Sequence, residues 1–405
     1  MTKKQLKKDF RYRDKLPELF FYVGLSVELL IVLIDKSELH NPIEGRLFQL
    51  TFSLFLLKLL FTKYSLKEWL CMFGLGLLGV ISYYVTGRNE ILRIVVFVCC
   101  MRDIDIKRAM RYVFRVTLIG VVVIVLLSCV GIGRIVPEQD FRTAHEGVRY
   151  SFGMGHPNAL HCMYLMLVLL FIYLHASSLK VWMLIALFAG NLFIYLFTDS
   201  RTGLLIATLA ILLACLMEKS KKLKKAGWPY YLGMLTFLGA IGISVLGAKY
   251  SQLIWYEEKL KRLDELLSGR FLTLYYDTTV HEGILETWRL FSSPESMRAF
   301  DAGWIRMFYW YGIIPGIIFC LLLLLLLRHC RKTGNYMGLV MIVVLALYTI
   351  VEAHIVSVYL ARNYLLFLFA GMFAEIGMQD QREYWFRCYR LWPGNGKVVK
   401  HAAEE

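Results

Sequence analysis

The chain has 405 residues, of which 58% are hydrophobic and 19% are charged, and its mean hydropathy is +0.54. This composition excludes an ordinary soluble domain, in which about half of the residues are apolar and about a quarter are charged. The net charge of +15 does not indicate a nucleic-acid partner, because the Lys and Arg residues cluster between apolar runs instead of forming one stripe. We therefore expect a protein whose main partner is the lipid bilayer.

Apolar runs that can cross a bilayer recur along the whole chain. A span needs about 20 largely apolar residues, and fewer where neighbouring helices shield it. By this rule we expect an all-α polytopic membrane protein with about 12 transmembrane helices in a single integral membrane domain, residues 1–405. The expected spans lie near residues 17–34, 46–62, 69–85, 90–101, 112–133, 158–175, 180–198, 202–217, 229–249, 305–327, 336–353 and 361–377. The first lacks a small-residue cleavage site after it, so we expect a retained span and not a signal peptide.

Basic residues alternate between the two sides of these spans. Lys and Arg are concentrated before the first span, after the last span, and in the loops after the second, fourth, eighth and tenth spans. Loops rich in Lys and Arg remain in the cytoplasm, so both termini are expected to be cytoplasmic in a multi-pass protein of the cell (cytoplasmic) membrane. The longest stretch without a span, residues 251–304, then becomes a large extracytoplasmic loop.

Polar residues of unusual kinds gather on the expected outer side. They are the run Arg149-Tyr-Ser-Phe-Gly-Met-Gly-His156-Pro-Asn158, the turn Thr198-Asp-Ser-Arg201-Thr-Gly203, Arg270 and Asp301 in the large loop, and Glu352 and His354 after the eleventh span. Arginine can hold phosphate oxygens with its planar fork and stays charged in a partly dry site. A carboxylate nearby can accept a proton from a hydroxyl nucleophile. The set indicates a site for an anionic substrate with a general base.

Each of these residues also has a structural interpretation. Asp199 and Arg201 are common in tight turns, a single histidine such as His156 commonly hydrogen-bonds the backbone, and Glu352 can cap a helix. Arg270 lies in a charged loop, where solvation is the usual role. Their coincidence on one side of the membrane is what favours a functional site.

At these residues the chain resembles the Wzy-type polysaccharide polymerases and the wider O-antigen ligase/polymerase superfamily. The resemblance rests on the segment 149–158, on Ser200-Arg-Thr-Gly203 two spans later, and on a large outer loop before the tenth span, and it covers residues 149–316. Where the ligases carry His followed by Asn, Ser or Gln, then nine intervening residues and then Gly-x-x-Thr-Gly, this chain has Asp301-Ala302, nine residues and then Gly312-Ile-Ile-Pro-Gly316. The spacing is kept, and an aspartate replaces the histidine.

The resemblance implies a GT-C-like glycosyltransferase architecture and the polymerisation of undecaprenyl-diphosphate-linked oligosaccharide repeat units into capsular polysaccharide or exopolysaccharide. It implies that Arg201 and Arg270 hold the diphosphate and that Asp301 is the base of an inverting transfer without a metal or another cofactor. The implied substrate-binding residues are Arg149, His156, Asn158, Glu352 and His354. Glu352 and His354 remain alternatives to Asp301 as the base, and a flippase and a chain-length regulator are expected pathway partners.

Two other functions fit parts of the same pattern. An O-antigen-ligase-like enzyme, which transfers finished glycan to another acceptor, shares every feature above. A transporter or flippase of lipid-linked oligosaccharide usually has charged or Gly/Pro-broken spans at mid-membrane in both halves. Here the ionisable residues cluster on one side, which favours the enzyme.

Overall fold

The structure is a computed structural model that describes residues 15–137, 148–276, 281–296 and 298–390. In this part of the chain there is no β-strand, and one isolated bridge joins Ser37 to Met154. The helices are α2 (Lys15–Lys36), α3 (Glu44–Leu60), α4 (Leu66–Thr86), α5 (Glu90–Cys100), α6 (Ile106–Cys129), α7 (Pro157–Leu174), α8 (Val181–Thr198), α9 (Arg201–Lys219), α10 (Lys221–Lys225), α11 (Trp228–Tyr256), α12 (Glu258–Leu266), α13 (Thr273–Tyr276), η2 (Leu285–Thr287), α14 (Gly303–Tyr311), α15 (Ile313–Thr333), α16 (Tyr336–Val351), η3 (Leu360–Arg362) and α17 (Leu365–Arg390).

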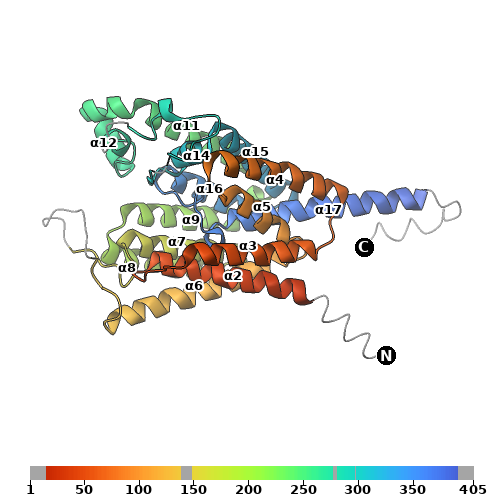
Figure 1. Cartoon of the computed structure of the whole chain (residues 1–405). Helices are drawn as coiled ribbons and strands as arrows, with labels where there is room; N and C mark the ends of the chain where they lie inside the picture. The colour runs from red at the N-terminus through yellow and green to blue at the C-terminus, as the bar shows by residue number, and fades with distance from the viewer. Residues whose placement is uncertain (1–14, 138–147, 277–280, 297, 391–405) are drawn as a thin grey trace.

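The long helices lie side by side in one bundle. In Figure 1 the start of α2 and the end of α17 lie at one end of the bundle, and α12 lies at the other. Eight of the described helices are long and apolar enough to cross a membrane, namely α2, α4, α6, α7, α8, α9, α11 and α15. The fold is therefore that of an all-helical, multi-pass membrane protein.

The expectation of about 12 spans is met only in part. The other four expected spans form helices, but α3, α5 and α16 are short, and the apolar part of α17 covers only Leu365–Gly377. At 1.5 Å per residue, the 11 residues of α5 extend over roughly 17 Å, about half of the hydrocarbon thickness. The expected span 305–327 is divided at Gly312 into α14 and α15, and α11 continues to Tyr256, beyond the expected start of the large loop.

Arg93 shows how a charged residue is accommodated in α5. Its Nη2 lies 2.9 Å from Oε1 of Glu28 on α2, its Nη1 donates to the carbonyl oxygen of Val358, and Thr51 on α3 donates to the same Glu28 oxygen. Both charged side chains are buried, at 4% and 0% exposure. An ionisable side chain at such a depth needs a partner, and this pair connects α2, α3 and α5 to the segment after α16.

The centre of the bundle is occupied by α16, which is buried along almost all of its length and packs on α7, α9, α11 and α14. The indole of Trp304, on α14, is fully buried and donates to the carbonyl oxygen of Ala346 at 2.9 Å. This packing fixes α14 and the end of α16 relative to each other. Asp301 and Glu352, which flank these two elements, are thereby brought to the same end of the bundle.

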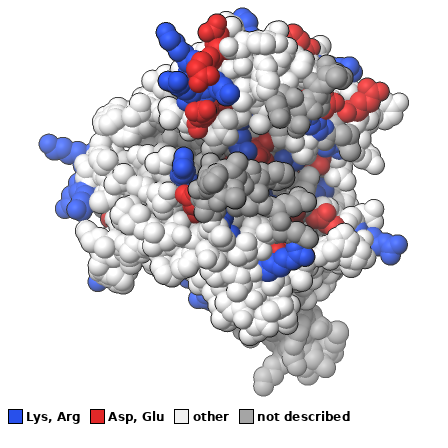
Figure 2. Space-filling model, turned by 90° about the vertical axis from the view of Figure 1, so that its left-hand side faces the viewer, with Lys and Arg blue, Asp and Glu red and all other residues white. Residues whose placement is uncertain are grey.

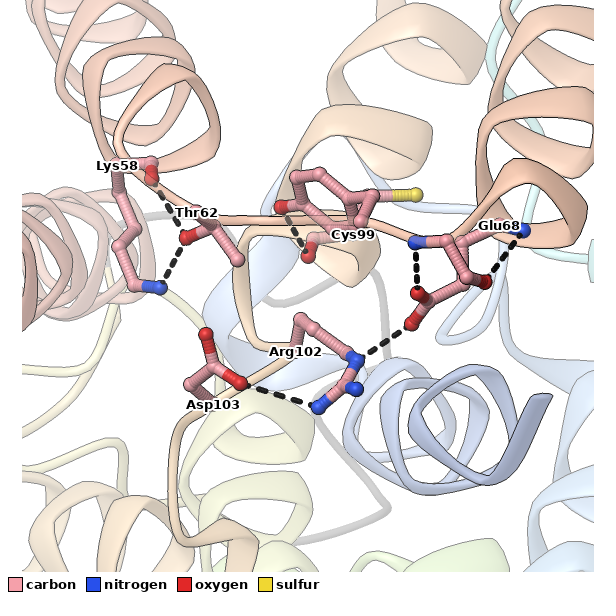
Figure 3. A network of polar contacts seen from close by, with 8 residues as sticks. Lys58, Thr62, Glu68, Cys99, Arg102 and Asp103 are labelled. Carbon is pink, nitrogen blue, oxygen red and sulfur yellow. Dashed lines mark hydrogen bonds and ion pairs between the residues drawn. The ribbon is translucent and has the colours of Figure 1, made fainter. Parts of the chain in front are cut away.

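A polar network ties the helix ends at the other end of the bundle, where α3 meets α4 and α5 meets α6 (Figure 3). Arg102 bonds to both Glu68 and Asp103, and Glu68 forms a capping box with Ser65 at the start of α4. Lys58 donates to the hydroxyl of Thr62. Every charged side chain here has a polar partner, as a structural network at a helix boundary requires.

Candidate active site

Most of the polar residues singled out in the sequence line one cavity at the α12 end of the bundle. Its volume is about 720 Å³, and its walls contain Arg149, His156, Asn158, Arg201, Arg270, Asp301 and Glu352. Figure 2 looks onto this end of the molecule, where acidic and basic side chains stand out from a surface that is mostly uncharged. The cavity is assembled from the ends of α2, α8 and α16, the starts of α7 and α9, and the loop around Arg270.

Arg270 is the centre of the polar contacts in this cavity. Its Nη1 lies 2.6 Å from Oδ2 of Asp301, its Nη2 lies 2.9 Å from Oε1 of Glu352, and its Nε donates to the carbonyl oxygen of Val351 at 3.0 Å. All three nitrogens of one guanidinium are thus engaged. Since the fork bonds both carboxylates, Arg270 holds Asp301 and Glu352 on one wall of the cavity.

The loop that carries Arg270 is held by a buried carboxylate. Asp264, at 2% exposure, accepts hydrogen bonds from the backbone amides of Phe271 and Leu272. Between Asp264 and Phe271, Ser268 and Gly269 adopt positive φ angles of 64° and 69°, which turn the chain back toward the bundle. Burial raises the pKa of Asp264, and the two amide hydrogen bonds oppose that shift. Asp264 therefore positions Arg270 without lining the cavity itself.

The two carboxylates differ in their surroundings. The side chain of Asp301 is 52% exposed, whereas that of Glu352 is 24% exposed. Burial and the neighbouring charge of Asp301 raise the pKa of Glu352 to about 7, against the opposing effect of Arg270. Glu352 therefore changes its charge near neutral pH.

Arg149 joins two elements of the cavity wall. Its Nε donates to the carbonyl oxygen of Thr198 at the end of α8, and its Nη2 donates to Oδ1 of Asn158 at the start of α7, both at 2.7 Å. The side chain of His156 caps α7 by accepting from the amide of Asn158 at 3.1 Å. The structural interpretation of these residues thus holds alongside their position at the cavity, because Arg149, His156 and Asn158 shape the wall that they line.

Arg201 is the first residue of α9 and is exposed in the cavity. Among the described residues its side chain has no hydrogen-bond or ion-pair partner. The turn before it is fixed by His161, whose two ring nitrogens bond to Thr198 and Asn191. A Cβ on Gly203 would lie 2.5 Å from the His161 ring, so this position favours glycine. The turn presents Arg201 to the cavity with its charge uncompensated.

His354 lies behind the wall of the cavity and does not line it. It is 2% exposed, its Nε2 lies 2.9 Å from the carbonyl oxygen of Arg362, and its Nδ1 lies 3.8 Å from the sulfur of Cys162. Burial and the positive charge of Arg362 lower its pKa well below the usual range. Of the three candidate bases in the sequence, the geometry leaves Asp301 and Glu352 facing the cavity.

Two cations of the cavity were missed in the sequence. Lys36, at the end of α2, lies 2.7 Å from Asp35, and Arg362, in η3, has a buried Nε without a hydrogen-bond partner in the described part of the chain. Arg362 is the one Lys or Arg in the connection between α16 and α17, residues 352–364, and that isolation was a usable signal. Lys36 has the position of an ordinary basic residue at the end of a span, so nothing in its sequence context marks it as a cavity residue.

Nothing in the described residues groups three or more His, Cys, Asp or Glu side chains in a way that could hold a metal ion. Comparisons with known protein families, with curated proteins and with solved structures found no match. The chemistry of the cavity is therefore argued from its own residues. They offer several cations for an anionic ligand, beside two carboxylates that can take a proton.

Proposed function

We propose that this protein is a glycosyltransferase of the cell membrane that polymerises undecaprenyl-diphosphate-linked oligosaccharide repeat units into a capsular polysaccharide or exopolysaccharide. The observation that carries the proposal is the position of Arg270 between Asp301 and Glu352, in a cavity that also contains Arg201. A diphosphate leaving group needs cations, and a sugar hydroxyl nucleophile needs a base. The cavity contains both the arginines and a carboxylate that can act as the base.

Arg201 and Arg270 are suited to bind the diphosphate of the donor. Arg201 has no counter-ion in the described structure, and Arg270 is shared between two carboxylates whose oxygens a diphosphate can replace. Both guanidinium groups stay charged and can hold two phosphate oxygens at once. They stabilise the negative charge that develops on the diphosphate as the glycosidic bond breaks, which lowers the barrier of transfer.

Asp301 is placed to act as the base. Its carboxylate accepts the proton of an acceptor hydroxyl while the oxygen of that hydroxyl forms a bond to the anomeric carbon of the donor. The bond from that carbon to the diphosphate breaks, and the electron pair leaves with the diphosphate. Attack from the face opposite the leaving group inverts the anomeric configuration, as in inverting glycosidases with a sugar in place of water.

The orientation follows from the charge of the loops. The end of the bundle that carries the Lys and Arg clusters near residues 102–111 and 219–225 is the cytoplasmic end by the positive-inside rule. The cavity lies at the opposite end and opens to the outer face of the membrane. There it can receive lipid-linked units from a flippase and act together with a chain-length regulator.

The test is polymer formation by the purified protein in nanodiscs with a synthetic undecaprenyl-diphosphate oligosaccharide, read as a ladder on a gel. We expect a ladder from the wild type and none from Asp301→Asn or Arg270→Ala. Arg262→Ala is the matched control, because Arg262 lies on the exposed face of α12 and its one ion-pair partner among the described residues is Glu258. A single transfer to another acceptor indicates a ligase, and movement of the lipid between leaflets without transfer indicates a transporter; either result contradicts the proposal.

A further inference from the structure

A second cavity lies on the side of the bundle, between α4, α5, α15 and α17. Its volume is about 140 Å³, and apart from two thiols its lining is entirely apolar, with Leu75, Ile94, Phe319, Phe369 and Met372 along its walls. Another face of α4 exposes large apolar side chains, among them Phe73 and Leu70. In a membrane protein such a groove faces hydrocarbon, so its ligand is part of an apolar chain.

The groove ends beside a pair of arginines. Its lining includes Ile91 and Pro315, near the starts of α5 and α15. Ile91 follows Glu90 directly, and Pro315 lies four residues after Tyr311. The phenol of Tyr311 is close to the charges of Glu90, Arg88 and Arg306. The groove lining therefore comes within three residues of Arg88 along the chain, and Arg88 and Arg306 both lie close to Tyr311.

The two arginines share one aromatic ring. The guanidinium carbon of Arg306 lies 3.5 Å from the centroid of Trp310, and that of Arg88 lies 4.1 Å from it. Arg88 also donates to the carbonyl oxygen of Ser296. The Nε of each arginine is buried without a hydrogen bond, and the side chain of Arg306 makes no ion pair or hydrogen bond with any residue that the structure describes. Two neighbouring cations so placed favour an anionic ligand.

Arg306 also connects this cluster to the polar cavity. It lies close enough to Asp301 and Arg362 for their charges to act on it, and both of those residues line the cavity. Asp301, which pairs with Arg270, is therefore also close to Arg306.

We propose that the side groove together with Arg88 and Arg306 is a second polyprenyl-diphosphate site, which holds the lipid of the acceptor. This inference rests on the proposed function, in which both substrates carry such a lipid. The groove takes a segment of the prenyl chain, the two arginines take its diphosphate, and the attached sugar extends to Asp301. The acceptor belongs here because Asp301 takes the proton from the acceptor hydroxyl.

The test is equilibrium binding of radiolabelled undecaprenyl diphosphate, without sugar, to the purified protein in nanodiscs. The wild type should bind two equivalents. Arg306→Gln should bind one equivalent, because it removes the cation that has no ion-pair partner in the described structure. Leu75→Trp should also bind one equivalent, because its side chain fills the groove. Arg201→Gln should also bind one, because it affects the donor site. Leu77→Trp is the matched control, since Leu77 is 48% exposed on α4 and does not line the groove, and it should bind two.

The outcomes separate this inference from the proposed function. The wild type could form polymer but bind one equivalent of lipid, with that equivalent lost in Arg201→Gln and retained in Arg306→Gln. This result would contradict the second site and leave the proposed polymerase unaffected. If the wild type binds no lipid and forms no polymer, both the proposed function and the second site are contradicted.

Excess unlabelled phosphatidylglycerol should leave the second equivalent of undecaprenyl diphosphate bound. Its displacement would identify the groove as an ordinary bilayer-lipid site and overturn the proposal. The melting temperature of each variant checks that it is folded.

Discussion

The hydroxyl oxygens of Thr202 and Ser268 lie 3.0 Å apart. Thr202 follows Arg201 at the start of α9, and Ser268 precedes the turn that carries Arg270. One hydrogen bond thus joins the two segments that hold the proposed diphosphate-binding arginines, although 66 residues separate them in the chain. The relative position of Arg201 and Arg270 depends on this contact.

Thr202→Val should therefore reduce polymer formation. An uncharged hydrogen bond contributes about 1 kcal/mol, so the rate should fall by up to about tenfold while the protein stays folded. The measurement is the initial rate in nanodiscs together with the melting temperature. Thr236→Val is the matched control, because the Thr236 hydroxyl is exposed on α11 and bonds only within its own helix. Equal rates for both variants would show that the contact does not position the arginines.

Arg270→Lys should be nearly as inactive as Arg270→Ala. The three guanidinium nitrogens contact Asp301, Glu352 and the Val351 carbonyl, and a lysine ammonium cannot reproduce that planar fork. We expect a loss of about 100-fold or more in kcat/KM, equivalent to about 3 kcal/mol. Activity close to that of the wild type would mean that the position requires only a positive charge.

The pH dependence should identify the base. The raised pKa of Glu352, about 7, means that this group is largely neutral below pH 7 and charged above it. Charged Glu352 competes with the diphosphate for Arg270, so with Asp301 as the base the rate should fall as the pH rises through about 7. Glu352→Gln should remain active and lose this dependence.

The opposite profile would assign the base to Glu352. In that case the rate should rise through about pH 7, and Glu352→Gln should be inactive.

Thermal stability gives an independent check on Glu352. The pKa of Glu352 in the folded protein lies above its ordinary value of 4.5. The contribution of protonated Glu352 to the free energy of unfolding is therefore complete below about pH 4.5 and is lost as the pH rises through about 7. The melting temperature of Glu352→Gln should lack that decline.

Gly312→Ala should destabilise the protein. Gly312 has a φ of 103°, and an added Cβ would lie 2.6 Å from the carbonyl oxygen of Leu290 and from Cα of Phe291. Strain of this kind costs about 1–3 kcal/mol, so we expect a lower melting temperature. Gly76→Ala is the control, because Gly76 lies in α4 with no atom within 4 Å of its added Cβ, and it should be neutral or slightly stabilising.

The sequence predicted the helical class and most of the cavity, because both leave local signals. Apolar runs predicted the long helices, and alternation of basic loops placed Arg149, Arg201, Arg270, Asp301 and Glu352 on one side, where the structure brings them into one cavity. The number of spans was less predictable. Hydropathy already gave a short fourth span, 90–101, which forms the 11 residues of α5, but it does not reveal that Gly312 interrupts the expected span 305–327.

The errors within the site come from tertiary packing. His354 is only two residues from Glu352, yet the chain after α16 turns so that Glu352 faces the cavity while His354 bonds the carbonyl oxygen of Arg362. Arg362 and Lys36 reach the cavity from opposite ends of the sequence. His156 has both the structural and the cavity-lining position that the sequence presented as alternatives.

The short basic helix α10 divides the residues of the cavity into two sets. Arg149, His156, Asn158 and Arg201 precede it, and Arg270, Asp301 and Glu352 follow it. During synthesis, therefore, no nascent chain holds both proposed donor-binding arginines and the proposed base until Asp301 has been made, after α10, α11 and α12. For the same reason a gene split within the α10 codons should yield two inactive fragments that recover polymerisation only when they are expressed together.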